Sequence, residues 1–403
     1  MKRALLIIAV AALSLAACNK ENQENGKGGN GGSYAVDAYW ADDYSGAYGI
    51  QIETPAGKTT MMTLGGQPLY VTGVNCYNLF VQCHESSAMS TTDMEQTVAV
   101  MAEKGVPIVR FSCSPYSPSQ MTYYVDQKAK YLGNLEKLAE LCDENHILLI
   151  PSVFWNTSCL PEYFGEALKA WGSTSSKTYQ FMIEYTTDIV NTLKGHKCLA
   201  AWEFGNEFNL AADISSAGYP DIPASDVGTA YKGFAETVAS LDPQGRMICS
   251  GNSVMRNAQW NLANNGSWST DSFDQYVTIT GVMTPDPMNG MSEHLYEEAR
   301  SFSDLGDLNR TQQVIRAKEA AASLGKAYYV GEFTGPGSAV NDTVAVKKHY
   351  TTYYSQKVQI SLIWNYALKG DIEYSFKAGT PGGEMVFRQM RNFNQKFKEM
   401  QSK

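Results

Sequence analysis

Short apolar runs alternate with longer amphipathic segments along most of this 403-residue sequence. Short runs rich in β-branched and aromatic residues predict buried strands, whereas apolar residues at every third or fourth position predict helices. The predicted strands cover residues 69–75, 106–111, 146–153, 198–204, 246–250, 290–295, 327–330 and 360–364. The predicted helices cover residues 92–104, 123–144, 177–193, 226–241, 308–324, 342–357 and 384–400. This alternation predicts a parallel sheet, and eight units predict a closed (β/α)8 TIM barrel.

The alternation is least regular between the fifth and sixth strands. Residues 253–289 contain a poorly marked helix, and residues 277–283 could instead form an extra strand. A doubly wound open sheet is the competing architecture, but it usually has a glycine-rich phosphate loop after its first strand, and Val74-Asn-Cys-Tyr-Asn78 is not one. Before the first strand, residues 34–68 have short β-like segments with turn residues and predict a small hairpin that caps the barrel.

The N-terminus has the layout of a bacterial secretory signal. Lys2 and Arg3 precede an apolar run, residues 4–13, that is too short to span a bilayer. The ending Leu15-Ala-Ala-Cys18 resembles a lipobox, in which Cys18 would be acylated and become the new N-terminus. We therefore expect a signal peptide over residues 1–17, a flexible Gly- and Asn-rich tether over 18–33 and the (β/α)8 domain over 34–403. The expected location is lipid-anchored at the outer membrane or cell surface; plain cleavage and release is the alternative.

Charge and motif content narrow the range of partners. The formal net charge is −9, and the sequence has no basic run and no nucleic-acid-binding motif. An acidic surface repels phosphate backbones, so nucleic acid is not an expected partner. No cofactor or metal motif is recognisable, and we expect a monomer that needs neither.

The cysteines besides Cys18 give no zinc pattern such as Cys-x-x-Cys. They are Cys76, Cys83, Cys113, Cys142, Cys159, Cys198 and Cys249. Since seven is an odd number, at least one stays unpaired. A disulfide is possible among those near the strand C-terminal ends, namely Cys76, Cys83, Cys113 and Cys159. Buried free thiols are the default expectation, above all for Cys198 and Cys249.

Two glutamates stand at the ends of predicted strands that are far apart in sequence. Glu207 follows the fourth strand and Glu332 follows the seventh. In a (β/α)8 barrel the residues after all eight strands face one cleft, so these carboxylates should lie close together. The other polar and aromatic residues expected there are Asn75, Tyr77, Arg110, Trp155, Asn156, Asn206, His294, Tyr296 and Trp364. Two carboxyl groups beside aromatic rings are what glycoside hydrolysis needs, because one protonates the leaving oxygen and the other attacks the anomeric carbon.

Several of these segments together resemble glycoside hydrolase clan A, and most of all family 5, the cellulase and β-mannanase family. The segments are Leu64-Gly-Gly-Gln-Pro-Leu-Tyr-Val-Thr-Gly-Val-Asn75, Val106-Pro-Ile-Val-Arg-Phe111, Trp202-Glu-Phe-Gly-Asn-Glu207, Glu293-His-Leu-Tyr296, Val330-Gly-Glu332 and Trp364-Asn-Tyr366. The resemblance spans residues 64 to 403. It implies a retaining endo-β-mannanase or endo-β-glucanase that acts on a plant-type β-linked glycan.

The resemblance also implies roles for individual residues. Glu207 would be the acid/base and Glu332 the nucleophile. The supporting set would be Arg110 and Tyr296 orienting Glu332, Asn206 bonding the sugar 2-hydroxyl, His294 supporting the acid/base region and Trp364 forming the floor of the subsite. Arg110 should lower the pKa of Glu332, and the charge of Glu332 should raise that of Glu207. Trp155, Trp171, Trp260 and Trp268 are further candidate sugar platforms.

The sequence departs from the family pattern at two points. Phe208 replaces the proline that many relatives have after the acid/base, and Phe154-Trp-Asn156 lacks the histidine of many cellulases. The second departure argues against a standard cellulase cleft, and the layout Phe154-Trp-Asn156, Tyr163-Phe-Gly165 and Trp171 before the third helix looks more like the mannanases. A glycan-binding lipoprotein without catalysis, and a clan A enzyme with another β-glycosidase or transglycosylase specificity, remain as alternatives. The sequence gives no function for Glu203, for which Arg246 or Lys197 could be partners.

Overall fold

Eight parallel strands close into a barrel in the computed structural model, which describes residues 37–55, 60–214, 222–296, 300–334, 343–370 and 374–401. The strands are β4 (Val71–Asn75), β5 (Ile108–Ser112), β6 (Leu148–Phe154), β7 (Ala201–Gly205), β8 (Met247–Cys249), β9 (Gly290–Leu295), β12 (Ala327–Phe333) and β13 (Ile360–Ile363). Each pairs in parallel with its neighbours, and β13 closes the ring on β4. The predicted (β/α)8 barrel is confirmed. The expected signal peptide, the lipidation site Cys18 and the tether lie outside the described residues.

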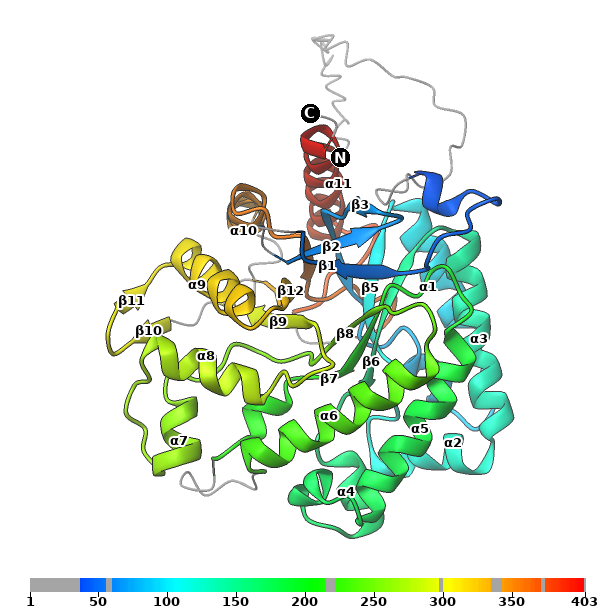
Figure 1. The fold of residues 1–403 in the computed structure, drawn as a ribbon. Helices are drawn as coiled ribbons and strands as arrows, with labels where there is room; N and C mark the ends of the chain where they lie inside the picture. Colours follow the sequence, from blue (N-terminus) through cyan, green and yellow to red (C-terminus); the bar gives the residue numbers. More distant parts are fainter. Residues whose placement is uncertain are drawn as a thin grey trace, which may run out of the picture. The chain divides into compact units, whose positions relative to one another are not determined.

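Helices surround the strands, following the chain from cyan to red in Figure 1. They are α1 (Thr92–Glu103), α3 (Lys128–Glu144), α5 (Lys177–Leu193), α6 (Ala224–Leu241), α8 (Phe273–Val282), α9 (Arg310–Ser323), α10 (Thr343–Ser355) and α11 (Pro381–Gln401). Short helices α2 (Met121–Asp126), α4 (Cys159–Phe164) and α7 (Gln259–Asn265) lie in the loops. The predicted helix over 123–144 is interrupted, because Gln127 leaves the helical conformation with φ −132° and ψ 38°.

Several strands begin later than predicted. Residues 106 and 107 precede β5, and residues 198 to 200 precede β7, although these positions are buried. These residues pack in the apolar core at the N-terminal ends of the strands. They are as hydrophobic as strand residues, so a prediction based on hydrophobicity begins the strand too early. In contrast, β12 continues to Phe333 and includes Glu332, with a register shift against β9 between Val330 and Glu332.

The irregular region between β8 and β9 is helical. Residues 277–283, which could have formed an extra strand, lie in α8 or directly after it, so that alternative is wrong. Ser272 accepts a hydrogen bond from the backbone N–H of Gln275, and the Gln275 side chain accepts one from the backbone N–H of Ser272. This capping box starts the helix and outweighs the β-branched residues that suggested a strand. A small hairpin, β10 (Arg300–Phe302) with β11 (Gly306–Leu308), was not predicted.

The N-terminal cap is a three-stranded antiparallel sheet. Its strands are β1 (Ile50–Glu53), β2 (Met61–Leu64) and β3 (Gln67–Pro68), so the predicted hairpin is confirmed and has one additional short strand. Gln359, just before β13, accepts a hydrogen bond from the backbone N–H of Met62 at 2.8 Å and donates to its carbonyl oxygen at 2.7 Å. Ile50 donates to the carbonyl oxygen of Ala200. The cap therefore lies at the N-terminal ends of the strands and leaves their C-terminal ends free of it.

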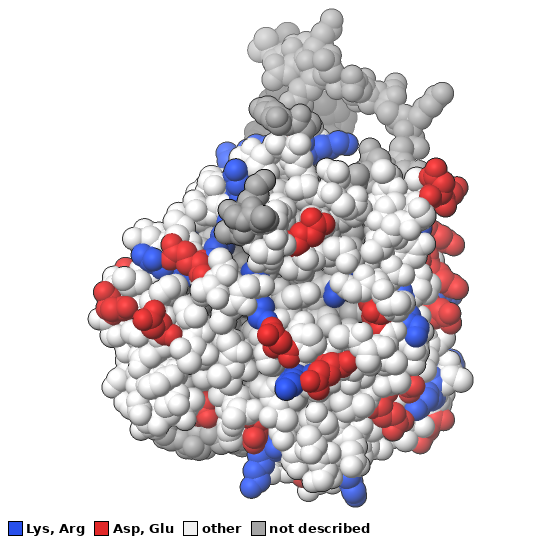
Figure 2. All heavy atoms as spheres, in the orientation of Figure 1, with Lys and Arg blue, Asp and Glu red and all other residues white. Residues whose placement is uncertain are grey.

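The seven cysteines of the described residues are all buried and unpaired. Burial raises the pKa of each of them, including Cys76, Cys113 and Cys249, as expected for thiols that act as apolar core residues. None of the described helices is long and apolar enough to cross a membrane. Acidic and basic side chains are interspersed over the face drawn in Figure 2.

Candidate active site

The C-terminal ends of the barrel strands bring polar residues from the whole chain together. Arg110 lies on β5, His294 on β9 and Glu332 on β12, while Glu207 follows β7 with only Asn206 between them. Arg110 and Glu332 are 222 positions apart in sequence and are hydrogen-bonded. Because parallel strands point their C-terminal ends to one side, strand order and register alone place these side chains in one cluster.

Arg110 is the centre of this cluster and is fully buried. Its guanidinium donates to Glu332 Oε1 at 2.6 Å, Glu203 Oε1 at 2.7 Å, Asn206 Oδ1 at 2.9 Å and Asn75 Oδ1 at 3.1 Å. These four hydrogen bonds together fix the orientation of the guanidinium. Charge-assisted hydrogen bonds of this kind are stronger than neutral ones, so Arg110 holds the Glu332 carboxyl group in a defined position.

Glu332 is held at both oxygens. Arg110 donates to Oε1, and the Tyr296 hydroxyl donates to Oε2. Its side chain is only 4% exposed. Burial raises the pKa of Glu332, while the charge of Arg110 and the hydrogen bond from Tyr296 act to lower it. The expected lowering by Arg110 is therefore present, but burial outweighs it.

Glu207 lies in a different environment from Glu332. Its side chain is 25% exposed, and its backbone has a left-handed conformation with φ 55°. The backbone N–H donates to the carbonyl oxygen of Gly251 at 2.9 Å, and His294 Nδ1 lies 2.8 Å from Oε1. Burial raises the pKa of Glu207, and Arg110 partly opposes this. The pair thus consists of one carboxyl group fixed in the interior and one with access to solvent.

One oxygen of Glu207, one of Glu332 and one ring nitrogen of His294 lie within 4.8 Å of one another. Three such atoms could ligate a cation. However, the guanidinium of Arg110 already lies 2.6 Å from Glu332 Oε1, and its positive charge would repel a metal ion. The geometry instead favours two neighbouring carboxyl groups that act without a metal ion between them.

His294 is fully buried, and this burial lowers its pKa to about 4. The ring is therefore neutral at pH 7. Its Nδ1 lies between the carboxyl groups of Glu207 and Glu332, at 2.8 and 3.5 Å, whereas Nε2 has no hydrogen-bond partner among the described residues. A neutral imidazole next to two acceptors is best placed with its proton on Nδ1, from which it donates to Glu207.

This protonation state can be measured directly. In the full chain with ¹⁵N-labelled histidine, the signals of His294 should titrate near pH 4, about two units below an exposed histidine. They are assigned by their loss in His294→Gln. A midpoint near 6.5 would contradict the neutral, Nδ1-protonated ring at neutral pH.

Aromatic side chains form one side of the cluster. The rings of Trp155 and Trp364 are stacked at 6.0 Å, and Tyr77 lies 5.0 Å from Trp155 and 6.5 Å from Trp364. The guanidinium carbon of Arg110 lies 4.8 Å from the Trp155 ring. Trp155 is buried while Trp364 is partly exposed. Trp364 is therefore the more accessible of the two rings to a ligand.

Two predicted site residues, Asn156 and Trp171, lie away from the glutamate pair. Asn156 donates to the carbonyl oxygen of Tyr116, in the loop after β5, and accepts from the backbone N–H of Ser158 in its own loop. Trp171 is buried against core aromatic rings and donates to the carbonyl oxygen of Thr157. These two residues stabilise the loop after β6, and neither forms a contact with the glutamate pair that would support a role in binding sugar.

Glu203, which the sequence left without a function, belongs to the cluster. It accepts from Arg110 at 2.7 Å and from the Tyr329 hydroxyl at 2.7 Å. The suggested partners were wrong: Arg246 pairs with Asp242, and Lys197 donates to a backbone carbonyl. Alternation along β7 turns Glu203 into the barrel interior, where only another strand can supply its partner.

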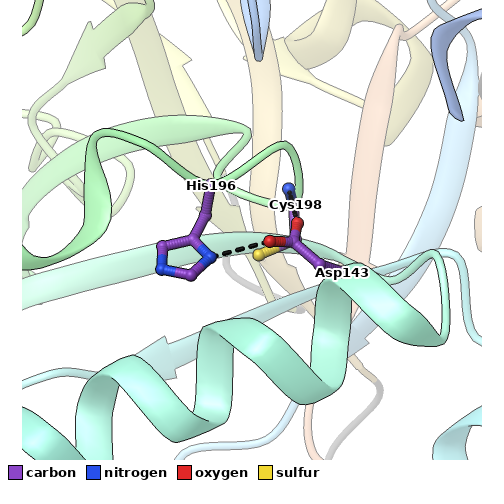
Figure 3. Close-up of side chains that lie close together, drawn as sticks. All are labelled: Asp143, His196 and Cys198. Carbon is purple, nitrogen blue, oxygen red and sulfur yellow. Dashed lines mark hydrogen bonds and ion pairs between the residues drawn. The ribbon is translucent and has the colours of Figure 1, made fainter. Parts of the chain in front are cut away.

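A second group with possible metal ligands lies at the opposite ends of the strands. Asp143, at the end of α3, contacts His196 and Cys198, which precede β7 (Figure 3). Asp143 Oδ2 lies 2.7 Å from His196 Nδ1, Oδ1 accepts from the backbone N–H of Cys198, and the Cys198 thiol donates to the carbonyl oxygen of Ala139. Burial raises the pKa of this thiol, which keeps it protonated. These contacts tie α3 to the segment before β7 and give the group a structural function.

Comparisons with known proteins agree with this architecture. No protein-family model matches the sequence, and no curated protein matches it. Among solved structures, an endo-1,4-β-mannanase from Rhizomucor miehei is 18% identical with a TM-score of 0.62, covering 85% of this chain and 99% of its own. The chain has the fold of glycoside hydrolase family 5 enzymes.

Two further structures show the same likeness. A glycoside hydrolase family 5 mannosidase from Rhizomucor miehei is 13% identical with a TM-score of 0.58, and the match covers 88% of this chain and 100% of the mannosidase. The β-mannanase of the blue mussel Mytilus edulis is 15% identical with a TM-score of 0.56, covering 87% of this chain and 97% of the mussel protein. At these identities the likeness is one of fold, and it confirms the family 5 resemblance of the sequence at that level.

Proposed function

We propose that this protein is a retaining β-glycoside hydrolase, with Glu332 as the nucleophile and Glu207 as the acid/base. The observation that carries this proposal is the carboxyl pair at the ends of β7 and β12, with one oxygen of each within 4.8 Å of the other. Retaining enzymes hold their two carboxyl groups about 5–5.5 Å apart, whereas inverting enzymes need about 6.5–9.5 Å for an intervening water molecule. The short separation supports the retaining mechanism.

The surroundings of each carboxyl group fit its role. Glu332 is fixed by Arg110 and Tyr296, so it can attack the anomeric carbon from a defined direction. Burial raises the pKa of Tyr296, which therefore stays a hydrogen-bond donor to the carboxylate. Glu207 has a raised pKa and partial exposure. It can give its proton to the leaving oxygen, and afterwards it can take a proton from the water that hydrolyses the glycosyl ester.

Asn75 has a structural role, whereas Asn206 is placed to bind substrate. Asn75 is fully buried and uses its whole amide, accepting from Arg110 and donating to the carbonyl oxygens of Gly331 and Leu362. It therefore positions the backbone next to Glu332. Asn206 is partly exposed and accepts from Arg110 through Oδ1. Its NH₂ group can therefore donate a hydrogen bond to a sugar hydroxyl.

The substrate that we propose is a β-linked polysaccharide or oligosaccharide, with β-mannan favoured over β-glucan. The similar structures are mannanases and a mannosidase, and the aromatic wall of Trp155 and Trp364 suits the C–H faces of sugar rings. The lipobox-like Leu15-Ala-Ala-Cys18 supports attachment to the membrane by lipid on Cys18, which the mass of the mature N-terminus would reveal.

The experiment that tests this function is a substrate panel with product sizing. The full chain is incubated with mannan, glucomannan, xyloglucan, mixed-linkage glucan and xylan, and new reducing ends are counted. We expect release from mannan or glucomannan, with early shortening of the polymer if the action is endo. Binding to a glycan without any new reducing ends would instead support the non-catalytic alternative. Products longer than the starting oligosaccharide would indicate glycosyl transfer.

A further inference from the structure

A cavity of about 640 Å³ opens beside Glu207. It lies between the loop after β8, the segment between α7 and α8, β10 and the start of α9. Glu207 and Tyr296 line one wall, and Glu332 does not line it. Since Glu207 would protonate the leaving oxygen, this cavity lies on the side that receives the leaving group.

Three arginines line the cavity. They are Arg256 in the loop after β8, Arg300 on β10 and Arg310 at the start of α9. Arg300 is buried, with 5% of its surface exposed, while Arg256 and Arg310 are partly exposed. Among the described lining residues, Glu207 is the only carboxylate. The described lining residues therefore carry more positive than negative charge, although Asp213 lies near Arg256, and Glu293 lies near Arg300 and Arg310.

The hydrogen bonds of these arginines go to neutral oxygens. Arg256 donates to the carbonyl oxygens of Asn209 and Leu210, Arg300 to that of Met255, and Arg310 to the side-chain oxygen of Gln313. None of the three forms an ion pair within the described part of the chain. Nη2 of Arg300 is buried and has no acceptor among the described residues.

The acidic residues nearest to Arg300 already have donors of their own. Glu293 accepts from the hydroxyls of Tyr276 and Tyr328, at 2.6 and 3.2 Å. Asp271 accepts two backbone N–H groups, from Trp260 and Asn261. Burial lowers the pKa of Arg300, although Glu293 and Asp271 partly oppose this. Since Arg300 Nη2 is a buried donor without an acceptor among the described residues, the cavity favours a ligand that supplies an acceptor oxygen there. A carboxylate supplies such oxygens together with a charge opposite to that of the three arginines.

We propose that this cavity is a leaving-group subsite for a sugar that carries a carboxylate, that is, a uronic acid unit of the glycan. The inference rests on the proposed function, because Glu207 defines the leaving-group side. A planar carboxylate fits the fork of a guanidinium, which can donate two parallel hydrogen bonds to it. Trp268, which lines the cavity and is 54% exposed, offers an indole face for the pyranose ring.

The test compares two ligands that differ only at C6, methyl β-D-glucuronide and methyl β-D-glucoside. Binding to the full chain carrying Glu332→Gln is measured by isothermal titration or ligand-observed NMR. Hydrogen bonds to charged groups predict about tenfold tighter binding of the glucuronide. In Arg256→Gln/Arg310→Gln, made in the same background, we expect the preference to fall to about twofold or less. Both arginines are partly exposed, so the fold should tolerate the change.

Arg388→Gln is the matched control, since it removes a positive charge from an exposed position on α11. It should keep the full preference. Equal binding of the two ligands, a preference that survives in the double variant, or one that is lost equally in Arg388→Gln would each overturn the proposal. Tighter binding of glucose 6-sulfate than of the glucuronide would overturn the assignment to a carboxylate. The measurement does not require hydrolysis, so its failure alongside cleavage of neutral mannan leaves the proposed function intact.

Discussion

Glu332→Ala should lower kcat/KM on the preferred polysaccharide by about a thousandfold or more, measured as reducing ends released at neutral pH. The variant retains Glu207 but has no carboxylate to attack the anomeric carbon, so the covalent step is lost. Binding of the glycan should persist, because the aromatic wall of Trp155 and Trp364 is unchanged. Glu236→Ala, which removes an exposed carboxylate on α6, should leave the rate unchanged.

Azide distinguishes the nucleophile from the acid/base when it is added to Glu332→Ala and to Glu207→Ala. Azide is a small anion that fits the space of a missing carboxylate, and on an activated aryl β-glycoside it can attack from the same face. Glu332→Ala with azide should therefore give an α-glycosyl azide. In Glu207→Ala the intact nucleophile still forms the glycosyl ester, and azide should then give a β-glycosyl azide. Unchanged hydrolysis in Glu332→Ala, or the reverse pattern of products, would contradict the assignment.

Glu203→Ala should lower the free energy of unfolding by about 3 kcal/mol, measured by chemical denaturation at pH 7. Glu203 is fully buried and accepts from Arg110 and Tyr329. Its removal leaves the buried guanidinium with Glu332 as its one remaining anionic partner among the described residues. Since Arg110 also orients the nucleophile, kcat should fall as well, although Glu203 itself does not touch substrate.

Two controls make this prediction specific. Glu203→Gln keeps the shape and one oxygen acceptor, so its loss of stability should be smaller than that of Glu203→Ala. Glu319→Ala removes an exposed glutamate that pairs with Arg316 on α9, and it should change stability by less than about 1 kcal/mol. If Glu203→Ala were no more destabilising than Glu319→Ala, the Arg110–Glu203 ion pair would not stabilise the barrel.

The architecture could be predicted from the sequence because it depends on local patterns. The α5 and β9 boundaries agree with the predicted ranges, and the predicted alternation matches the closed ring. A residue at the end of a parallel strand faces the same side as every other such residue, so the nearness of Glu207 and Glu332 followed from topology alone. Boundaries such as the start of β7 were less accurate, since buried loop residues are as apolar as strand residues.

The pairing of buried side chains from distant strands depended on strand order in the closed barrel and on the register between neighbouring strands. The Arg110–Glu203 and Tyr329–Glu203 pairs join positions 93 and 126 residues apart, and no local pattern selects such partners. The same holds for Asp143 beside Cys198 and for the arginines around the cavity, whereas His294 lies beside Glu207 as the family resemblance implied. The sequence by itself determined the barrel and the two glutamates, because periodicity and strand ends are local properties. The tertiary structure decided which buried charges meet, because that depends on the inward side of each strand and on the shift in register at Gly331.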